Sequence, residues 1–172
     1  MLVPAACYKE EIEKKFAELA YTEMMMWYDG CIENYRHELP DGEDRYQFAI
    51  VEGGKLFGYV SFRVDWYCSQ AFNFGLMSFG GEYYSEQYNK YISGKVVVFK
   101  AIREIIRMIE SFNLHRIDFR CVGGNPAELN YTGIASMYHR KYFVRKVTFK
   151  DNIKDRQGNY HDTLMFEMIK KD

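Results

Sequence analysis

Hydrophobic and polar residues alternate along the first half of this chain with the period of β-strands. The alternation covers residues 46–51, 56–66 and 72–79, which predicts three strands. The segment 52–55 between the first two contains two glycines, which accept the positive φ angles of a tight hairpin turn. A further turn at 69–70 precedes the third run. We therefore expect three antiparallel strands in a meander.

The helical period appears most clearly over residues 94–111. Apolar residues recur there at alternating steps of four and three, which predicts one buried stripe on a helix. The residues of this stripe are Val98, Ile102, Ile105, Ile109 and Phe112. The preceding segment, 80–91, is polar and predicts a long loop. Its four tyrosines indicate either a functional lid or the packing of an irregular loop (Tyr83, Tyr84, Tyr88 and Tyr91).

Both ends of the chain add predicted elements around this centre. Residues 10–28 predict an amphipathic helix that ends in an apolar run, 24–28, for which we expect burial or a position beside a ligand. A short helix is predicted over 31–39. Strands are predicted over 116–122, 143–150 and 161–169, and a turn over 155–159. Asn125 has the sequence context of an N-cap, with Pro126 at the first position of another helix.

These elements predict an α/β (α+β) domain with a mixed, mostly antiparallel central sheet flanked by helices. The strand 72–79, the helix from Gly94 and the strand 116–122 form one unit. This order places the helix N-terminus just beyond the carboxyl end of the first strand and beside its parallel neighbour, where α/β sheets bind phosphorylated ligands. Ser93 and Gly94 are small and Lys95 is charged, which suits a pyrophosphate. An ordinary N-capped helix has the same features.

Composition narrows the function classes. With 172 residues, 48% of them hydrophobic, the chain has material for one domain, 1–172. The net charge of −1 gives no reason to expect nucleic-acid or anionic-membrane partners, and no apolar run is long enough to span a bilayer. The four cysteines are far apart and no signal peptide is evident, so we expect reduced thiols in the cytoplasm. The spacing of His115, His139 and His161 predicts no metal site.

The region from residue 114 to 162 resembles the GCN5-related N-acetyltransferase (GNAT) superfamily. The similar motifs are the strand that leads into Asn125-Pro126-Ala127 and the segment 158–162, Gly-Asn-Tyr-His-Asp. The resemblance is greatest to the ribosomal-protein N-terminal acetyltransferases and extends over residues 46–172. The family's pyrophosphate loop reads R/Q-x-x-G-x-G/A, and its positions here are Asn89, Ile92 and Gly94. Only the last glycine matches.

The resemblance implies transfer of an acetyl group from acetyl-CoA to a primary amine, on a small molecule or a peptide N-terminus, by direct attack. It implies a cofactor site at the end of the third strand and the start of the following helices (Met77, Ser78, Phe79, Ser93, Gly94, Lys95 and Asn125). Backbone N–H groups of a bulged strand end near Met77 and Ser78 are expected to stabilise the oxyanion. Gly75 in the same strand indicates either a bulge or close approach of another backbone, or a crowded cross-strand neighbour.

The catalytic groups are less clearly specified. The resemblance implies a tyrosine as the acid for the leaving thiolate, and both Tyr131 and Tyr138 qualify, with Tyr131 favoured. Glu82 or Asp65 is the candidate base, directly or through water. The alternative functions are a non-catalytic acyl-CoA-binding or protein-interaction domain on the same fold and a phosphate-binding protein unrelated to CoA. The aromatic strand edges allow a homodimer.

Overall fold

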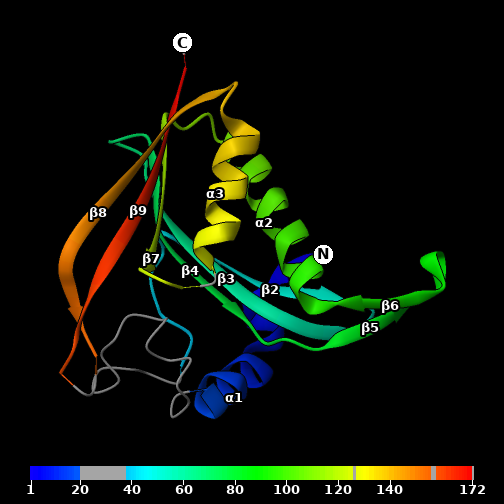
Figure 1. The fold of residues 1–172 in the computed structure, drawn as a ribbon. Coiled ribbons are helices and arrows are strands. Elements are labelled where there is room, and N and C mark those ends of the chain that lie inside the picture. Colours follow the sequence, from blue (N-terminus) through cyan, green and yellow to red (C-terminus); the bar gives the residue numbers. More distant parts are fainter. Residues whose placement is uncertain (20–37, 126, 156–157, 172) are drawn as a thin grey trace.

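The computed structural model describes residues 1–19, 38–125, 127–155 and 158–171, and the described strands form one seven-stranded sheet and a separate two-stranded one (Figure 1). The order of the large sheet is β1-β2-β3-β4-β7-β9-β8. Its neighbours are antiparallel except for β4 and β7, which are parallel. The strands are β1 (Leu2–Pro4), β2 (Arg45–Glu52), β3 (Lys55–Asp65), β4 (Gln70–Ser78), β7 (Arg116–Val122), β8 (Tyr142–Lys154) and β9 (Tyr160–Lys170).

Helices cover both faces of this sheet. The longest, α2 (Gly94–Ser111), lies beside α3 (Ala127–Tyr138) on one face, and both pack on the main hydrophobic core (Figure 1). The first helix, α1 (Lys9–Leu19), packs through Ile12 and Phe16 on a second core formed by the other face of β2 and β3. None of the described helices is long and apolar enough to cross a membrane.

The sheet divides between its two parallel strands. β4 and β7 pair only at Gln70 with Arg116 and at Ala71 with Ile117. Beyond these positions β4 continues along β3, and β7 continues along β9. The two strands therefore diverge toward their carboxyl ends, and the chain leaves the wide end of this divergence through the segment that leads into α2.

A β-bulge lies in β4 close to the point of divergence. The register between β3 and β4 shifts between Ser61 and Arg63, and Asn73 has a left-handed φ of 53°. Asparagine tolerates this conformation better than most residues do, because its short polar side chain can compensate locally. The bulge is not at Gly75 or near Met77 and Ser78, which pair regularly with Ser61, Tyr59 and Gly58. At Gly75 the other interpretation, a crowded cross-strand neighbour, fits, since a Cβ there would lie 3.2 Å from Ser61 Oγ.

The narrow end of the divergence is held by buried ion pairs. The Arg116 guanidinium lies 2.8 Å from carboxylate oxygens of both Asp118 and Glu167, which face each other across β7 and β9. Gln70 donates a hydrogen bond of 2.6 Å to Asp118, and Arg145 contacts Glu167 at 2.5 Å. The two carboxylates are almost fully buried. Side chains from four strands therefore meet where β4 and β7 separate.

The structure confirms most of the predicted elements. The three-strand meander, the helix 94–111 and the strands of the second half are present at nearly the expected positions. Asn125 caps α3 as predicted, since its Oδ1 accepts a hydrogen bond of 2.8 Å from the Ala127 N–H. Of the predicted helix 10–28, residues 9–19 form α1. The run 24–28 and nearly all of the helix 31–39 lie outside the described residues, and Glu38 and Leu39 are not helical. The three-residue strand β1 was not predicted.

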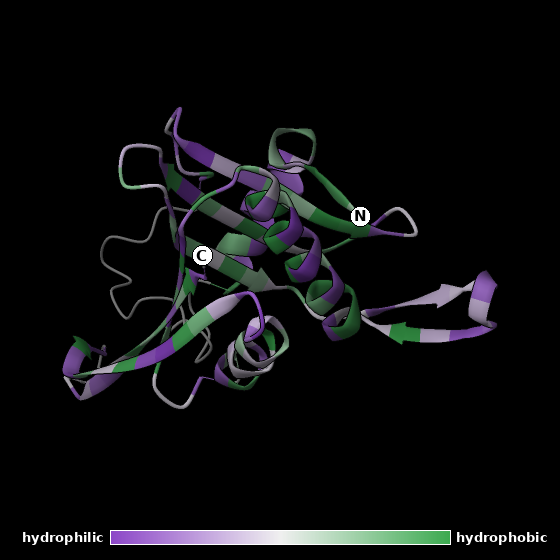
Figure 2. Ribbon diagram, turned by 90° about the horizontal axis from the view of Figure 1, so that it is seen from above, coloured by the Kyte–Doolittle hydropathy of each residue, from purple (hydrophilic) through white to green (hydrophobic). Residues whose placement is uncertain are grey.

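The segment 80–91 is not the irregular loop that its composition predicted. It forms a hairpin of β5 (Glu82–Ser85) and β6 (Lys90–Ser93), which extends away from the rest of the molecule (Figures 1 and 2). Tyr83 packs on Phe57 at the base of the hairpin, and Tyr84 contacts Tyr91 across it with ring centroids 5.3 Å apart. Tyr84 and Tyr91 thus form a cross-strand pair, and Tyr83 packs the base of the hairpin onto β3.

Candidate functional site

The divergence of β4 and β7 leaves two backbone edges that face each other. The Phe79 N–H donates to the Phe57 carbonyl, and the Gly123 N–H donates to the Asp162 carbonyl. Because hydrogen bonds alternate along an antiparallel pair, residues 76 and 78 of β4 and residues 120 and 122 of β7 direct their N–H and C=O groups into the divergence. Neither edge has a neighbouring strand beyond Ala71 and Ile117. An extended ligand with amide groups fits between such edges.

A small apolar cavity opens into this divergence from the helical side. Side chains from β3, β4, α2, β7 and α3 line it (Val60, Phe74, Leu76, Ile102, Ile105, Phe119 and Tyr131). The volume that the centre of a water molecule can occupy is only about 10 Å³, so the cavity has room for about one water molecule. Phe74 and Leu76 are partly exposed although they pack against the main core, so solvent reaches the cavity.

Aromatic rings close the narrow end of the cavity. The Phe74 and Phe119 ring centroids are 4.6 Å apart, which joins the two diverging strands on the helical side. Phe62 stacks on Phe74 at 5.2 Å, and Tyr131 stacks on Phe119 at 5.3 Å. Tyr131 also meets Phe166 edge to face at 5.9 Å. Five rings from five elements of the fold thus form a row, in which Phe74, Phe119 and Tyr131 line the cavity.

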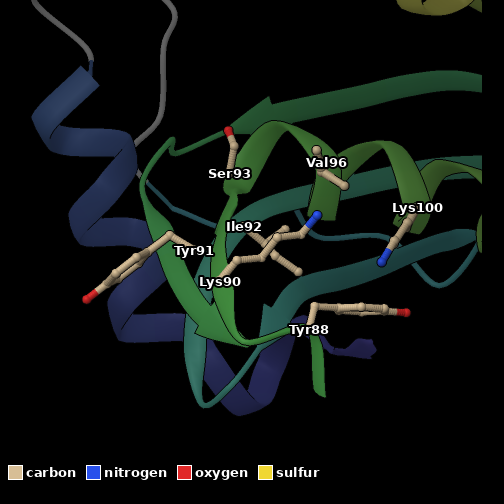
Figure 3. Close-up of a pocket in the computed structure, with 7 residues that line it drawn as sticks. All are labelled: Tyr88, Lys90, Tyr91, Ile92, Ser93, Val96 and Lys100. Carbon is tan, nitrogen blue, oxygen red and sulfur yellow. The ribbon is translucent and has the colours of Figure 1, made fainter. Parts of the chain in front are cut away.

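A second, larger pocket lies at the N-terminus of α2, where the hairpin joins the helix (Figure 3). It has a volume of about 280 Å³ and two lysines. Its lining consists of Tyr88, Lys90, Tyr91, Ile92, Ser93, Val96 and Lys100. The Lys100 ammonium lies 6.0 Å from the centre of the Tyr88 ring. Two cations beside a helix N-terminus favour an anionic ligand.

The N–H groups of the first turn of α2 are partly engaged already. The Gly94 N–H donates to the Gly81 carbonyl at 2.8 Å, and the Lys95 N–H donates to Ser93 Oγ at 3.3 Å. Of the donors that a helix start leaves without intrahelical acceptors, the Val96 N–H is the one that these two bonds leave for a ligand, and Val96 lines the pocket. An anion bound here would rely on that group and on the two lysines.

Gly94 itself is required by packing. A Cβ atom at this position would lie 2.6 Å from the Gly80 carbonyl oxygen and 2.8 Å from Cδ1 of Phe57. Both distances are far below ordinary contact. The glycine that matches the family loop thus allows the start of α2 to approach the segment after β4.

The two candidate acids occupy different surroundings. Tyr131 is buried and its ring lines the cavity between β4 and β7. Tyr138 lies two turns further along α3, beside Tyr142 at a centroid distance of 6.3 Å. Burial, with a smaller contribution from Glu110, raises the pKa of Tyr138. Tyr138 is not among the residues that line either described pocket, so the geometry favours Tyr131.

Neither candidate base lines the cavity. Glu82 is exposed at the start of the hairpin, where it pairs with Ser93. Asp65 accepts a hydrogen bond of 2.8 Å from the Cys68 N–H in the turn between β3 and β4. This bond and weaker ones from the same turn lower the pKa of Asp65. Both carboxylates have positions typical of surface groups.

The remaining predicted cofactor residues lie around the wide end of the divergence. Ser78 ends β4 with its N–H directed into the gap, whereas the Met77 and Phe79 N–H groups point toward β3. Ser93 caps α2 and lines the larger pocket, and the exposed Lys95 is not among the residues that line it. Asn125 is partly buried and caps α3.

The described residues contain no cluster of three metal-ligating side chains, and their cysteines are free thiols. Burial raises the pKa of the Cys121 thiol to about 11, which makes it a poor nucleophile near neutral pH. The sequence reading did not identify Lys90, Lys100, Phe74 or Phe119. Lys90 and Lys100 line the same pocket because the unpredicted hairpin lies beside α2.

No protein-family model and no curated protein sequence matches this chain. Solved structures do match it. A probable GNAT-family acetyltransferase from Chromobacterium violaceum has a TM-score of 0.59 and 13% identity, with 98% of this chain and 85% of that chain covered. The ribosomal-protein-S18-alanine N-acetyltransferase from Escherichia coli has a TM-score of 0.52 and 13% identity, with 77% and 74% covered.

A further probable acetyltransferase is 17% identical at a TM-score of 0.54. The match covers 74% of this chain but only 63% of that one, less than two thirds of its length. These likenesses show that the chain has the GNAT fold, which confirms the predicted fold class and the resemblance at the level of architecture.

Proposed function

We propose that this chain, which has the GNAT fold, transfers an acetyl group from acetyl-CoA to a primary amine of a small molecule or a peptide N-terminus. The observation that carries the proposal is the divergence of β4 and β7. Its two open edges and its small cavity lie between the bulge at Asn73 and a cationic pocket at the start of α2. This order of features suits a ligand with a phosphorylated end, an amide-containing arm and a small acyl group.

The binding of acetyl-CoA can be assigned to residues in that order. Its phosphates would lie against Lys90, Lys100 and Ser93. The pantetheine arm would run between β4 and β7 and pair its amides with the open edges. The acyl group would then lie at the apolar cavity, beside Phe74 and Tyr131. Holding the amine beside the bound thioester there would favour attack, because the reaction becomes effectively intramolecular.

The reaction would proceed by direct attack. The amine nitrogen adds to the thioester carbonyl, and the Leu76 N–H, which the β4 edge directs into the divergence near Phe74, stabilises the oxyanion. The carbon–sulfur bond then breaks, and the Tyr131 hydroxyl donates its proton to the departing CoA thiolate. We assign the proton lost by the amine to water, since neither Glu82 nor Asp65 lines the cavity. Water then restores the tyrosine proton.

The cationic pocket provides the first test. Lys100→Glu should weaken the binding of acetyl-CoA by at least about tenfold, because it places a negative charge beside the phosphates. Isothermal titration calorimetry of the wild type and the variant measures this. Lys14→Glu is the control, since Lys14 is an exposed residue of α1, on the opposite face of the sheet. Equal affinity of Lys100→Glu and wild type would contradict the assignment of the phosphates.

Tyr131→Phe should lower turnover about tenfold while leaving the affinity for acetyl-CoA nearly unchanged, because it removes one proton donor but keeps the ring. Release of free CoA thiol can be measured with spermidine and with a peptide that begins with alanine as acceptors. Tyr138→Phe is the matched control, and its turnover should equal that of the wild type. Loss of turnover in Tyr138→Phe alone would move the acid to the end of α3.

The second candidate function is a non-catalytic acyl-CoA-binding domain. Two observations favour it. The N–H groups of Gly94 and Lys95 already have acceptors within the protein, and the cavity is small. Such a domain would bind acetyl-CoA with the same dependence on Lys100. It would release no thiol with any amine, so the thiol assay separates the two functions.

A further inference from the structure

We infer that Phe74 and Leu76 restrict this chain to the shortest acyl groups, so that it discriminates against acyl-CoA donors longer than acetyl-CoA. The inference rests on the proposed function, because it concerns the donor of that reaction. Beyond that function, it specifies the length of acyl chain that the site accepts and the two side chains that limit this length.

The position of the acyl group follows from the position of the phosphates. An acyl-CoA whose phosphates lie at the start of α2 extends from Ser78 back toward the narrow end of the divergence. Residues 78 to 74 of β4 span about 13 Å at 3.3 Å per residue, roughly the reach of an extended pantetheine arm. The carbonyl would therefore lie near Phe74, and the acyl chain would point at the apolar cavity.

The space beyond the thioester carbonyl is small. The cavity holds about one water-sized group, and a methyl group has about that size. A butyryl or hexanoyl chain would need room that Phe74 and Phe119 occupy, since their ring centroids are 4.6 Å apart. Extra atoms in a close-packed region force neighbouring side chains out of place, and this cost reduces affinity.

The Phe74 ring is held in place by its neighbours. Its ring lies between Phe62 at 5.2 Å and Phe119 at 4.6 Å, and Phe119 in turn stacks on Tyr131. Phe62 is fully buried, which holds one side of Phe74 in place. Leu76 lines the cavity two residues further toward the wide end, on the same face of β4. Shortening either side chain should therefore enlarge the cavity without changing the strand edges.

The test is calorimetric titration of CoA, acetyl-CoA, butyryl-CoA and hexanoyl-CoA into wild type, Phe74→Leu, Leu76→Ala and Phe48→Leu. The wild type should bind acetyl-CoA and CoA with similar affinity and hexanoyl-CoA at least tenfold more weakly. Phe74→Leu and Leu76→Ala should reduce this ratio to threefold or less. Phe48→Leu is the control, because Phe48 packs on Phe62 from β2 and does not line the cavity; it should keep the wild-type ratio. Circular dichroism establishes that each variant is folded.

The outcomes separate the inference from the proposed function. Equal binding of acetyl-CoA and hexanoyl-CoA by the wild type would overturn the size restriction and leave the acyl-CoA site in place. An unchanged tenfold ratio in both folded variants, Phe74→Leu and Leu76→Ala, would show that other side chains set the limit. No binding of CoA or of any acyl-CoA by the folded wild type would overturn the proposed function and, with it, this inference.

Discussion

Replacing Gly94 by alanine is expected to destabilise the protein by about 3 kcal/mol, the upper end of the cost of overpacking a core. The added Cβ would lie 2.6 Å from the carbonyl oxygen of Gly80, which is backbone and cannot rotate away. It would also press on the buried ring of Phe57. The start of α2 would have to move, and with it the hydrogen bond from the Gly94 N–H to Gly81. Urea denaturation of the variant and the wild type measures the difference in free energy of unfolding.

Gly133→Ala is the matched control. Gly133 lies within α3, and no atom lies within 4 Å of a Cβ built there. Alanine has a higher helix propensity than glycine, so Gly133→Ala should stabilise the protein by about 0.5–1 kcal/mol. If Gly94→Ala also stabilised the protein, the close approach of α2 to Gly80 would be wrong.

The same contact decides how variants of Gly94 are used to study ligand binding. Gly94→Glu should abolish binding of acetyl-CoA, but a steric displacement of α2 would do so even if the phosphates lay elsewhere. Lys100→Glu avoids this ambiguity because Lys100 is exposed. The glycine that supported the family resemblance is thus explained by packing, and the proposed phosphate site rests on Lys90 and Lys100 instead.

The sequence predicted the elements that have clear periodicity. The apolar stripe of α2 and the alternation in β2, β3 and β7 predicted the bounds of those elements to within about one residue. The hairpin β5–β6 was missed because its strands have four residues each and carry tyrosines and polar residues in no regular order. The bulge was assigned to glycines on conformational grounds, whereas Asn73 adopts the left-handed conformation. The local sequence indicated that β4 could contain a bulge. The position of the bulge depends on the register between β3 and β4, which the local sequence does not determine.

The candidate site was harder to predict than the fold. Tyr131 and Tyr138 are seven residues apart, so they lie on the same side of one helix and have the same periodicity. What distinguishes them is tertiary: Tyr131 contacts Phe119 and Phe166 and lines the cavity, whereas Tyr138 does not line it. Phe74 and Phe119 belong to different strands, and each alone has the pattern of an ordinary core residue. Their joint closure of the divergence depends on how far β4 and β7 separate.

Arg116 lies at the point of separation and pairs with two buried carboxylates, and Arg116→Met should destabilise the protein by about 3–5 kcal/mol. The substitution keeps the aliphatic part of the side chain but leaves the carboxylates of Asp118 and Glu167 facing each other across β7 and β9. Their exposed fractions are only 4% and 1%, so water cannot compensate for the lost charge. Gln70 and Arg145 would remain as partners. Urea denaturation at neutral pH measures the loss.

Arg120→Met is the control on the same strand. Arg120 is exposed, so its replacement should change the free energy of unfolding by less than about 0.5 kcal/mol. The double variant Arg116→Met/Asp118→Asn should recover part of the loss, because it removes one of the two facing charges while keeping a polar partner for Gln70. A loss below about 1 kcal/mol in Arg116→Met would mean that Arg145 alone neutralises the pair. The narrow end of the divergence would then be held by the ion pair of Arg145 with Glu167 and by the contact between Phe74 and Phe119.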